Sequence, residues 1–192
     1  MPKIPDRHII AMDLELNQLN GKPRIIEIGF AVAEIESRKI IEKKSFLVNP
    51  MEEITPYINT LTSISQSMVC DRPALGGVYL EIKEWIAQFQ YRRQVVEWGA
   101  GDSWALKKEL RDHGITDDDW IFGYTSINVK TINQAIRESK GMGLQGGLAK
   151  SMNLYGLRYD GTKHRAHDDA LNTMRLYLRF LECLQGLNCF KD

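Results

Sequence analysis

The sequence predicts an α/β protein in which helices flank a mixed five-stranded sheet. Two observations lead to this fold class. Three apolar stretches with strand-like composition open the chain and are joined by short connections, which favours an antiparallel meander. Beyond them, segments with helical spacing of apolar residues alternate with short apolar runs, as in parallel strands joined by helices.

The three opening strands are predicted at residues 9–15, 25–35 and 40–48. Turn-forming residues at 17–23 separate the first two strands. The polar residues 36–39 predict a hairpin between the second and third strands. The chain therefore begins with an antiparallel unit.

The remaining chain is predicted to alternate helices and strands. The predicted strands are 94–98 and 120–122, which complete a sheet of five. The predicted helices are a short one at 65–69, one beginning at Pro73, one at 103–113, one through 129–136 and a long one after residue 168. Two apolar stripes predict core-facing helix surfaces: Val78, Ile82, Trp85, Ile86 and Phe89 in the first long helix, and Leu171, Met174, Leu178 and Leu181 in the last.

Composition predicts a single globular domain over residues 1–192. The chain is 43% hydrophobic and has a formal net charge of zero, so a polyanion has to be bound locally or through metal ions. The cysteines, Cys70, Cys183 and Cys189, are odd in number and lack zinc-type spacing, which is typical of a reducing compartment. No stretch has the length and apolarity of a signal or membrane segment, so we expect a cytoplasmic protein without membrane association.

Two acids follow the apolar part of the first strand. Asp13 and Glu15 are alternate strand residues, so their side chains project to one face while Met12 and Leu14 point into the core. Two neighbouring carboxylates repel each other and resist desolvation, and a divalent cation would remove both penalties. A strand that ends in polar residues at a solvated edge explains the same pattern.

Three further polar residues lie at the ends of predicted elements. Asp102 falls where a strand gives way to a helix, a common position for ligand-binding residues in α/β proteins. Asp169 lies in the first turn of the last helix, where an acid also suits the helix dipole. His164 precedes it by five residues and, taken alone, could equally be an ordinary loop histidine.

Residues 141–146 match the dinucleotide-binding pattern G-x-G-x-x-G. That pattern requires a preceding strand and an opening βαβ unit, but here a helical segment precedes it late in the chain. A joint between two helices is the better interpretation.

Taken together, these motifs resemble the DEDDh 3′–5′ exonucleases, the DnaQ-like branch of the ribonuclease H-like superfamily. Residues 13–15 resemble its D-x-E motif, residues 24–29 its second strand, and residues 98–102 the motif that supplies one aspartate. Residues 164–169 resemble its H-x-x-x-x-D motif, which selects His164 and Asp169 over the neighbouring His167 and Asp168.

The resemblance implies a ribonuclease H-like fold and a single DEDDh exonuclease domain over residues 1–192. It also implies two Mg²⁺ ions, replaceable by Mn²⁺, because hard carboxylate ligands suit these ions. The implied metal ligands are Asp13, Glu15, Asp102 and Asp169, with Asp13 bridging both ions. His164 is the implied general base.

Within this family, the loop at residues 57–64 is most similar to that of the Eri- and KapD-type exonucleases, although Ser63 replaces a family glycine. By this resemblance, the residues expected to bind the terminal nucleotide are Leu16, Tyr57, Leu61 and Thr62, with Tyr57 stacking on a base or packing within the loop. The expected substrate is the 3′ end of single-stranded RNA or DNA, with RNA favoured and nucleoside monophosphates released.

Two other functions remain open from the sequence. One is a catalytically silent nucleic-acid-binding domain on the same fold, which the complete set of catalytic residue types disfavours. The other is a ribonuclease H-like endonuclease, which the H-x-x-x-x-D motif disfavours. The sequence leaves protein partners and a homodimer undecided.

Overall fold

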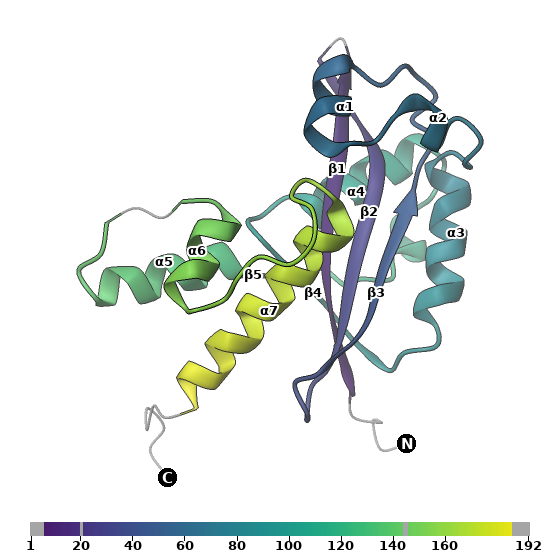
Figure 1. The fold of residues 1–192 in the computed structure, drawn as a ribbon. Coiled ribbons are helices and arrows are strands. Elements are labelled where there is room, and N and C mark those ends of the chain that lie inside the picture. The colour runs from purple at the N-terminus through teal and green to yellow at the C-terminus, as the bar shows by residue number, and fades with distance from the viewer. Residues whose placement is uncertain (1–5, 20, 144–145, 186–192) are drawn as a thin grey trace, which may run out of the picture.

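The computed structural model describes residues 6–19, 21–143 and 146–185. In chain order, the elements of this part of the chain are β1 (His8–Leu19), β2 (Lys22–Glu34), β3 (Ile40–Leu47), α1 (Pro56–Thr62), α2 (Gln66–Val69), α3 (Leu75–Ile86), β4 (Tyr91–Glu97), α4 (Asp102–Asp112), the 3₁₀ turn η1 (Asp117–Asp119), β5 (Ser126–Asn128), α5 (Val129–Ser139), α6 (Leu148–Leu154) and α7 (Ala166–Leu184) (Figure 1).

The strands form one mixed sheet in the order β3-β2-β1-β4-β5. Strand β1 pairs with β2, and β2 with β3, in antiparallel orientation, whereas β4 runs parallel to both β1 and β5. This confirms the predicted sheet of three antiparallel strands followed by parallel ones. It also makes β1 central. This strand continues to Leu19, beyond its predicted end at residue 15, so Asp13 and Glu15 lie midway along it, beside Gly29 and Glu27 of β2.

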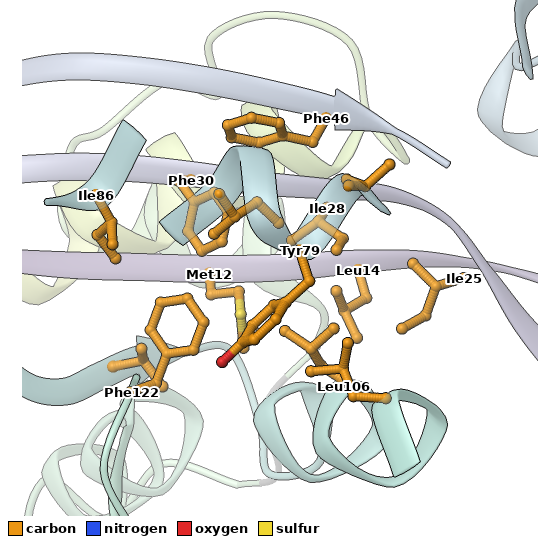
Figure 2. Packing of buried hydrophobic residues seen from close by; sticks show 14 of the residues in the cluster. Met12, Leu14, Ile25, Ile28, Phe30, Phe46, Tyr79, Ile86, Leu106 and Phe122 are labelled. Carbon is orange, nitrogen blue, oxygen red and sulfur yellow. The ribbon is translucent and has the colours of Figure 1, made fainter. Parts of the chain in front are cut away.

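The alternation of side chains along β1 separates two cores. Met12 and Leu14 point to the face covered by α3 and α4, where they pack in a cluster with Phe30 and Tyr79 (Figure 2). Ala11, on the other face, packs against α7. Because alternate strand residues share a face, Asp13 and Glu15 lie on the α7 side.

Helix α7 crosses the sheet face opposite α3 and α4 (Figure 1). Its first turn lies directly on Gly29 of β2. A Cβ atom at Gly29 would lie 2.0 Å from both the Ala166 carbonyl carbon and the His167 nitrogen. A side chain is therefore excluded here, and the missing Cβ lets the start of α7 approach the strand that lies beside Asp13 and Glu15.

The prediction of a fifth strand at 120–122 is wrong, because β5 is Ser126–Asn128. Trp120 and Phe122 are buried in the core like strand residues, which explains the apolar signal. The backbone of this segment is bound by side chains instead of a strand ladder. Ile121 O accepts hydrogen bonds from the Tyr91 hydroxyl (2.9 Å) and Arg93 Nε (3.2 Å).

The sequence predicts a loop at residues 57–64, but most of it is helix α1. Pro56 occupies the start of the helix, and the Thr55 hydroxyl caps it by accepting from Ile58 N at 3.3 Å. Asn17, just beyond Glu15, is fully buried, and its Oδ1 accepts from Thr55 N at 2.9 Å. These bonds fasten α1 beside the end of β1.

Residues 144–145, within the glycine-rich segment 141–146, and Cys189 lie outside the described residues. The segment lies between α5 and α6. Among the helices that the structure describes, none combines the length and apolarity needed to cross a membrane.

Candidate active site

Four of the sequence-predicted site residues line one cavity of about 520 Å³. Asp13 and Glu15 reach it from β1, Asp169 from the first turn of α7, and His164 from the loop that precedes α7. Asp102, the first residue of α4, is close enough that its charge raises the pKa of both Asp13 and Glu15. Segments from opposite ends of the chain thus supply a single site.

The acids of this site resist ionisation because burial and mutual repulsion disfavour their charged forms. Burial, followed by repulsion from Asp102 and Asp169, raises the pKa of Asp13 well above its ordinary value. Burial and the nearby Asp169 carboxylate raise the pKa of Glu15 to about 8. The pKa of Asp102 rises to about 7 through burial and the neighbouring Glu97. The cluster lacks enough positive charge to balance it.

The donor geometry fits a divalent cation. One potential ligand atom from each of Glu15, His164 and Asp169 lies within 4.8 Å of the others. Carboxylate oxygens are the hard ligands that Mg²⁺ and Mn²⁺ prefer, and a bound cation would relieve the repulsion that raises these pKa values. The residues present therefore fit a metal centre.

Asp169 is held on both of its oxygens. Its Oδ1 accepts from the Tyr159 hydroxyl at 2.8 Å, and its Oδ2 accepts from His164 N at 2.9 Å. His164 itself has a φ of 61°, in the left-handed region that non-glycine residues rarely adopt. Two residues of the segment 159–169 therefore donate hydrogen bonds to the carboxylate of its last residue, Asp169.

Asp168 and His167, which lie within the H-x-x-x-x-D segment but are not its defining residues, make other contacts. Asp168 is buried and accepts from Lys43 Nζ at 2.6 Å and from Thr162 N at 2.8 Å. His167 Nδ1 lies 2.9 Å from Oε1 of Glu27. Both residues brace the loop, and neither lines the cavity among the residues described.

Sequence reasoning missed Glu97, the last residue of β4. Its side chain is fully buried, and its Oε1 accepts from Ser103 N at 2.6 Å, in the first turn of α4. It also raises the pKa of Asp102. Its other oxygen has no hydrogen-bond partner among the described residues. The signal was available, because Glu97 is an acid near the end of the predicted strand 94–98, as Glu15 is at the end of the predicted strand 9–15.

The residues predicted to bind the terminal nucleotide are more scattered. Leu16 lines a second cavity of about 270 Å³ beside α4, which includes the exposed Trp104. Tyr57 lies on α1 and is 71% exposed. Thr62 is buried, and its hydroxyl donates to Ile58 O at 2.8 Å and accepts from Ile64 N at 3.1 Å. Its hydroxyl is thus occupied within its own turn.

Leu61, the remaining predicted nucleotide-binding residue, lies on α1 and is partly buried against a small apolar cluster that includes Ile58 and Ile64. None of the four is among the described residues that line the cavity at the acids. That cavity is completed by residues to which the sequence assigned no binding role: Trp98, Gly147, Leu148, Ala149, Lys150, Tyr159 and Lys163.

Ser63, where the family has glycine, ends α1 in the left-handed conformation with a φ of 59°. Glycine adopts this conformation without steric cost. The serine therefore keeps the backbone geometry for which a glycine is suited.

A mixed α/β sheet whose central strand brings two acids together with Asp102, Asp169 and His164 is suited to a metal-dependent nuclease. The family model described as exonuclease (RNase_T) matches residues 10–177. The chain belongs to this exonuclease family. Its family implies dependence on a divalent metal.

Solved structures share this fold. The nuclease domain of 3′hExo, a DEDDh family member bound to rAMP, superposes with a TM-score of 0.80 at 19% identity, covering 97% of this chain and 98% of that one. Cell-death related nuclease 4 (CRN-4) gives a TM-score of 0.78 at 18% identity, covering 93% of this chain and 65% of that one.

Curated relatives include much longer proteins. The chain is 27% identical over 180 residues to a DNA polymerase III PolC-type of Caldanaerobacter subterraneus subsp. tengcongensis, covering 93% of this chain but 12% of that protein. A PolC-type polymerase of Staphylococcus aureus is 31% identical over 84 residues, which is 43% of this chain and 6% of that protein. The chain thus spans a small part of the relatives that it matches.

Proposed function

We propose that the protein removes nucleoside monophosphates from the 3′ end of single-stranded nucleic acid, with RNA preferred over DNA. The observation that carries this proposal is the convergence of Asp13, Glu15, His164 and Asp169 on one cavity, with Asp102 beside them. Each of these residues has the chemical type that metal-assisted phosphodiester hydrolysis requires.

Asp13, Glu15, Asp102 and Asp169 would hold two Mg²⁺ ions, with Asp13 contributing to both and Mn²⁺ able to replace them. When bound, such ions neutralise charge on the scissile phosphate and make water more acidic. The four carboxylates supply hard oxygen ligands, and their pKa values are raised first by burial and then by neighbouring acids, both of which bound cations would offset.

His164 acts as the general base in this proposal. An imidazole ring nitrogen is the commonest general base in enzymes, and here it would accept the proton of the attacking water. Its position supports this role, because it is exposed at the cavity and a ring nitrogen lies within 4.8 Å of oxygens of Glu15 and Asp169.

Two lysines support the binding of a phosphodiester chain. Lys150 and Lys163 line the same cavity as Asp13 and Glu15. Because the net charge of the whole chain is zero, phosphate groups must be attracted by such local charges. Trp98 and Leu148 add apolar surface to the same cavity. Leu16 and Leu61 are proposed to hold the terminal sugar and base, Tyr57 to stack on a base, and Thr62 to complete this subsite through its backbone.

The preference for RNA rests on similarity alone. The structural neighbour 3′hExo is described with bound rAMP, and another 3′-exonuclease, with a TM-score of 0.78 and 18% identity, is described as recognising a histone mRNA stem-loop. The PolC-type relatives are DNA polymerases by name. A direct comparison of the two substrates is therefore part of the test.

The test is incubation of the purified protein with matched RNA and DNA oligonucleotides, labelled at either the 3′ or the 5′ end, with Mg²⁺ or Mn²⁺. We expect the 3′ label to appear at once as mononucleotide, while the 5′-labelled strand shortens as a ladder, faster for RNA. Internal cuts would indicate an endonuclease, and faster loss of DNA would overturn the preference.

The Asp13→Asn variant and a chelator are the controls, and both should abolish the reaction. A catalytically silent nucleic-acid-binding domain is the second candidate. It predicts that the wild type binds oligonucleotides without shortening them under any metal condition, and the complete set of metal ligands and base argues against it.

A further inference from the structure

We infer that Glu27 of β2 is a positioning residue, which holds the loop carrying His164 and the first turn of α7 carrying Asp169 against the sheet. Glu27 is not one of the residues that line the cavity in the described chain. It therefore acts through the loop that it holds. This inference rests on the proposed roles of His164 and Asp169.

The contacts of Glu27 are concentrated on three consecutive residues where that loop joins α7. Its Oε2 accepts from Arg165 Nε at 3.0 Å and from Ala166 N at 3.0 Å. Its Oε1 accepts from Arg165 Nη2 at 3.1 Å and lies 2.9 Å from His167 Nδ1. A fifth bond comes from the Ser45 hydroxyl of β3 at 2.6 Å. The carboxylate is fully buried, and each oxygen has partners.

The bond to Ala166 N matters for the helix that presents Asp169. Residue 166 is the first residue of α7, and the preceding Arg165 provides no side-chain cap of its own. Backbone N–H groups at a helix start need an outside acceptor, and the positive end of the helix dipole favours an anion there. Glu27, on strand β2, provides both the acceptor and the negative charge.

Gly29 completes the contact two residues further along β2. It allows the backbone of residues 166–167 to approach the strand, as described above. Glu27 supplies the hydrogen-bond acceptors and Gly29 the space, so residues 27–29 form a docking site for the start of α7. His164 and Asp169 flank the docked residues on either side.

The left-handed backbone of His164 gives this docking a catalytic consequence. A non-glycine residue with a φ of 61° costs free energy and persists only where the surroundings hold it. The holding bonds come from Asp169 Oδ2 on one side and, through Arg165, from Glu27 on the other. If the hydrogen bonds of Glu27 to residues 165–167 are lost, we expect His164 and Asp169 to lose their fixed positions together.

The test compares Glu27→Gln with two matched controls. Glu27→Gln preserves the size of the side chain. It removes the negative charge that pairs with Arg165 and leaves one acceptor oxygen in place of two. Ser45→Ala removes a bond to the same carboxylate without touching the loop. Ile82→Val trims a buried side chain on α3, on the far face of the sheet, and costs about 0.5–1.5 kcal/mol of stability.

Three quantities are measured for each variant: the urea midpoint, kcat and KM on the labelled oligonucleotide, and Mn²⁺ affinity by calorimetry. For Glu27→Gln we expect kcat and Mn²⁺ affinity to fall about 10- to 100-fold, the usual range for residues that orient metal ligands, with KM little changed. Ser45→Ala and Ile82→Val should keep kcat and Mn²⁺ affinity. Wild-type kcat and Mn²⁺ affinity in Glu27→Gln would overturn the inference, as would an equal kcat loss in Ile82→Val at equal stability.

A second variant covers the case in which Glu27→Gln does not fold. Arg165→Met removes the guanidinium and leaves Glu27 bound to Ala166 N and His167, so a smaller fall in kcat and Mn²⁺ affinity is expected. Failure of the proposed function would look different. A wild type without exonuclease activity removes that proposal, while the Mn²⁺ affinities still decide whether Glu27 positions Asp169.

Discussion

Glu15 and Glu27 are register partners on the neighbouring strands β1 and β2, yet their pKa values move in opposite directions. The pKa of Glu15 rises to about 8, because burial and nearby carboxylates disfavour its charge. Hydrogen bonds from His167 and Arg165, opposed by burial, bring the pKa of Glu27 down to about 2. One glutamate is therefore charged and fully bonded, while its neighbour favours its protonated form.

This difference predicts how pH affects the metal-free protein. The folded pKa values of Glu15 (about 8) and Asp102 (about 7) lie above their ordinary values of 4.5 and 3.8. Folding thus favours the protonated acids, and this stabilisation is lost as pH rises through the folded pKa values. Glu27 has the opposite shift, so its contribution is lost only as pH falls from 4.5 toward 2.

We therefore expect the free energy of unfolding in EDTA to be lower at about pH 9 than at about pH 6. Saturating Mn²⁺ should abolish most of this difference, because it stabilises the charged acids. Urea denaturation at both pH values, with and without metal, measures the effect. Equal stability at the two pH values in EDTA would contradict the raised pKa values.

Gly29→Ala is expected to displace the first turn of α7. The added Cβ would lie 2.0 Å from backbone atoms of Ala166 and His167, which cannot move aside as a flexible side chain does. Overpacking of this kind costs about 1–3 kcal/mol or more, and activity should fall because Asp169 moves with the turn. Urea denaturation and the oligonucleotide assay measure both effects. Gly143→Ala is the control, since its Cβ would meet nothing within 4 Å, and identical behaviour of the two variants would refute the close approach.

Much of this arrangement was predictable from the sequence because the signals are local. The alternation in 9–15 predicted which face of β1 carries Asp13 and Glu15, and the D-x-E and H-x-x-x-x-D spacings selected the site residues over His167 and Asp168. Glu27 was missed because it acts on partners that only the fold brings near, whereas Glu97 was overlooked although its partner Ser103 lies six residues away in the sequence. The prediction of a strand at residues 120–122 was wrong because a buried loop segment and a buried strand have the same apolar sequence pattern.

Ser63→Gly is expected to stabilise the protein. Ser63 has a φ of 59°, and a left-handed conformation costs a non-glycine residue roughly 1–2 kcal/mol, partly offset by the greater entropy of glycine when unfolded. We expect a net gain of about 1 kcal/mol or less in urea denaturation, with activity unchanged. Ser67→Gly, within the regular turn of α2, should destabilise instead. A loss of stability in Ser63→Gly would show that the side chain has a role of its own.

His164→Ala is expected to reduce kcat while leaving Mn²⁺ affinity largely intact. General bases commonly contribute about 10²- to 10⁴-fold to rate. The position of His164 near Glu15 and Asp169 also allows a ligand role, so rate and metal affinity must be measured on the same sample. A parallel fall in Mn²⁺ affinity and kcat would make His164 a ligand, and an unchanged kcat would remove it from the mechanism.

Tyr159→Phe is expected to weaken metal binding through Asp169. The Tyr159 hydroxyl donates to Asp169 Oδ1 at 2.8 Å, and this bond opposes the rise that burial causes in the pKa of Asp169. Without it, the pKa of Asp169 rises further, so protons compete better with the metal near neutral pH. Loss of a ligand-orienting bond typically lowers metal affinity or activity about 10- to 100-fold.

Calorimetric titration with Mn²⁺ at several pH values checks this expectation, because the deficit of Tyr159→Phe should shrink as pH rises and Asp169 ionises. Tyr91→Phe is the matched control. Its hydroxyl bond to Ile121 O, at 2.9 Å, lies in the segment before β5, so it should cost stability without changing Mn²⁺ affinity. A deficit in Tyr159→Phe that does not depend on pH would mean that the hydroxyl orients Asp169 without affecting its ionisation.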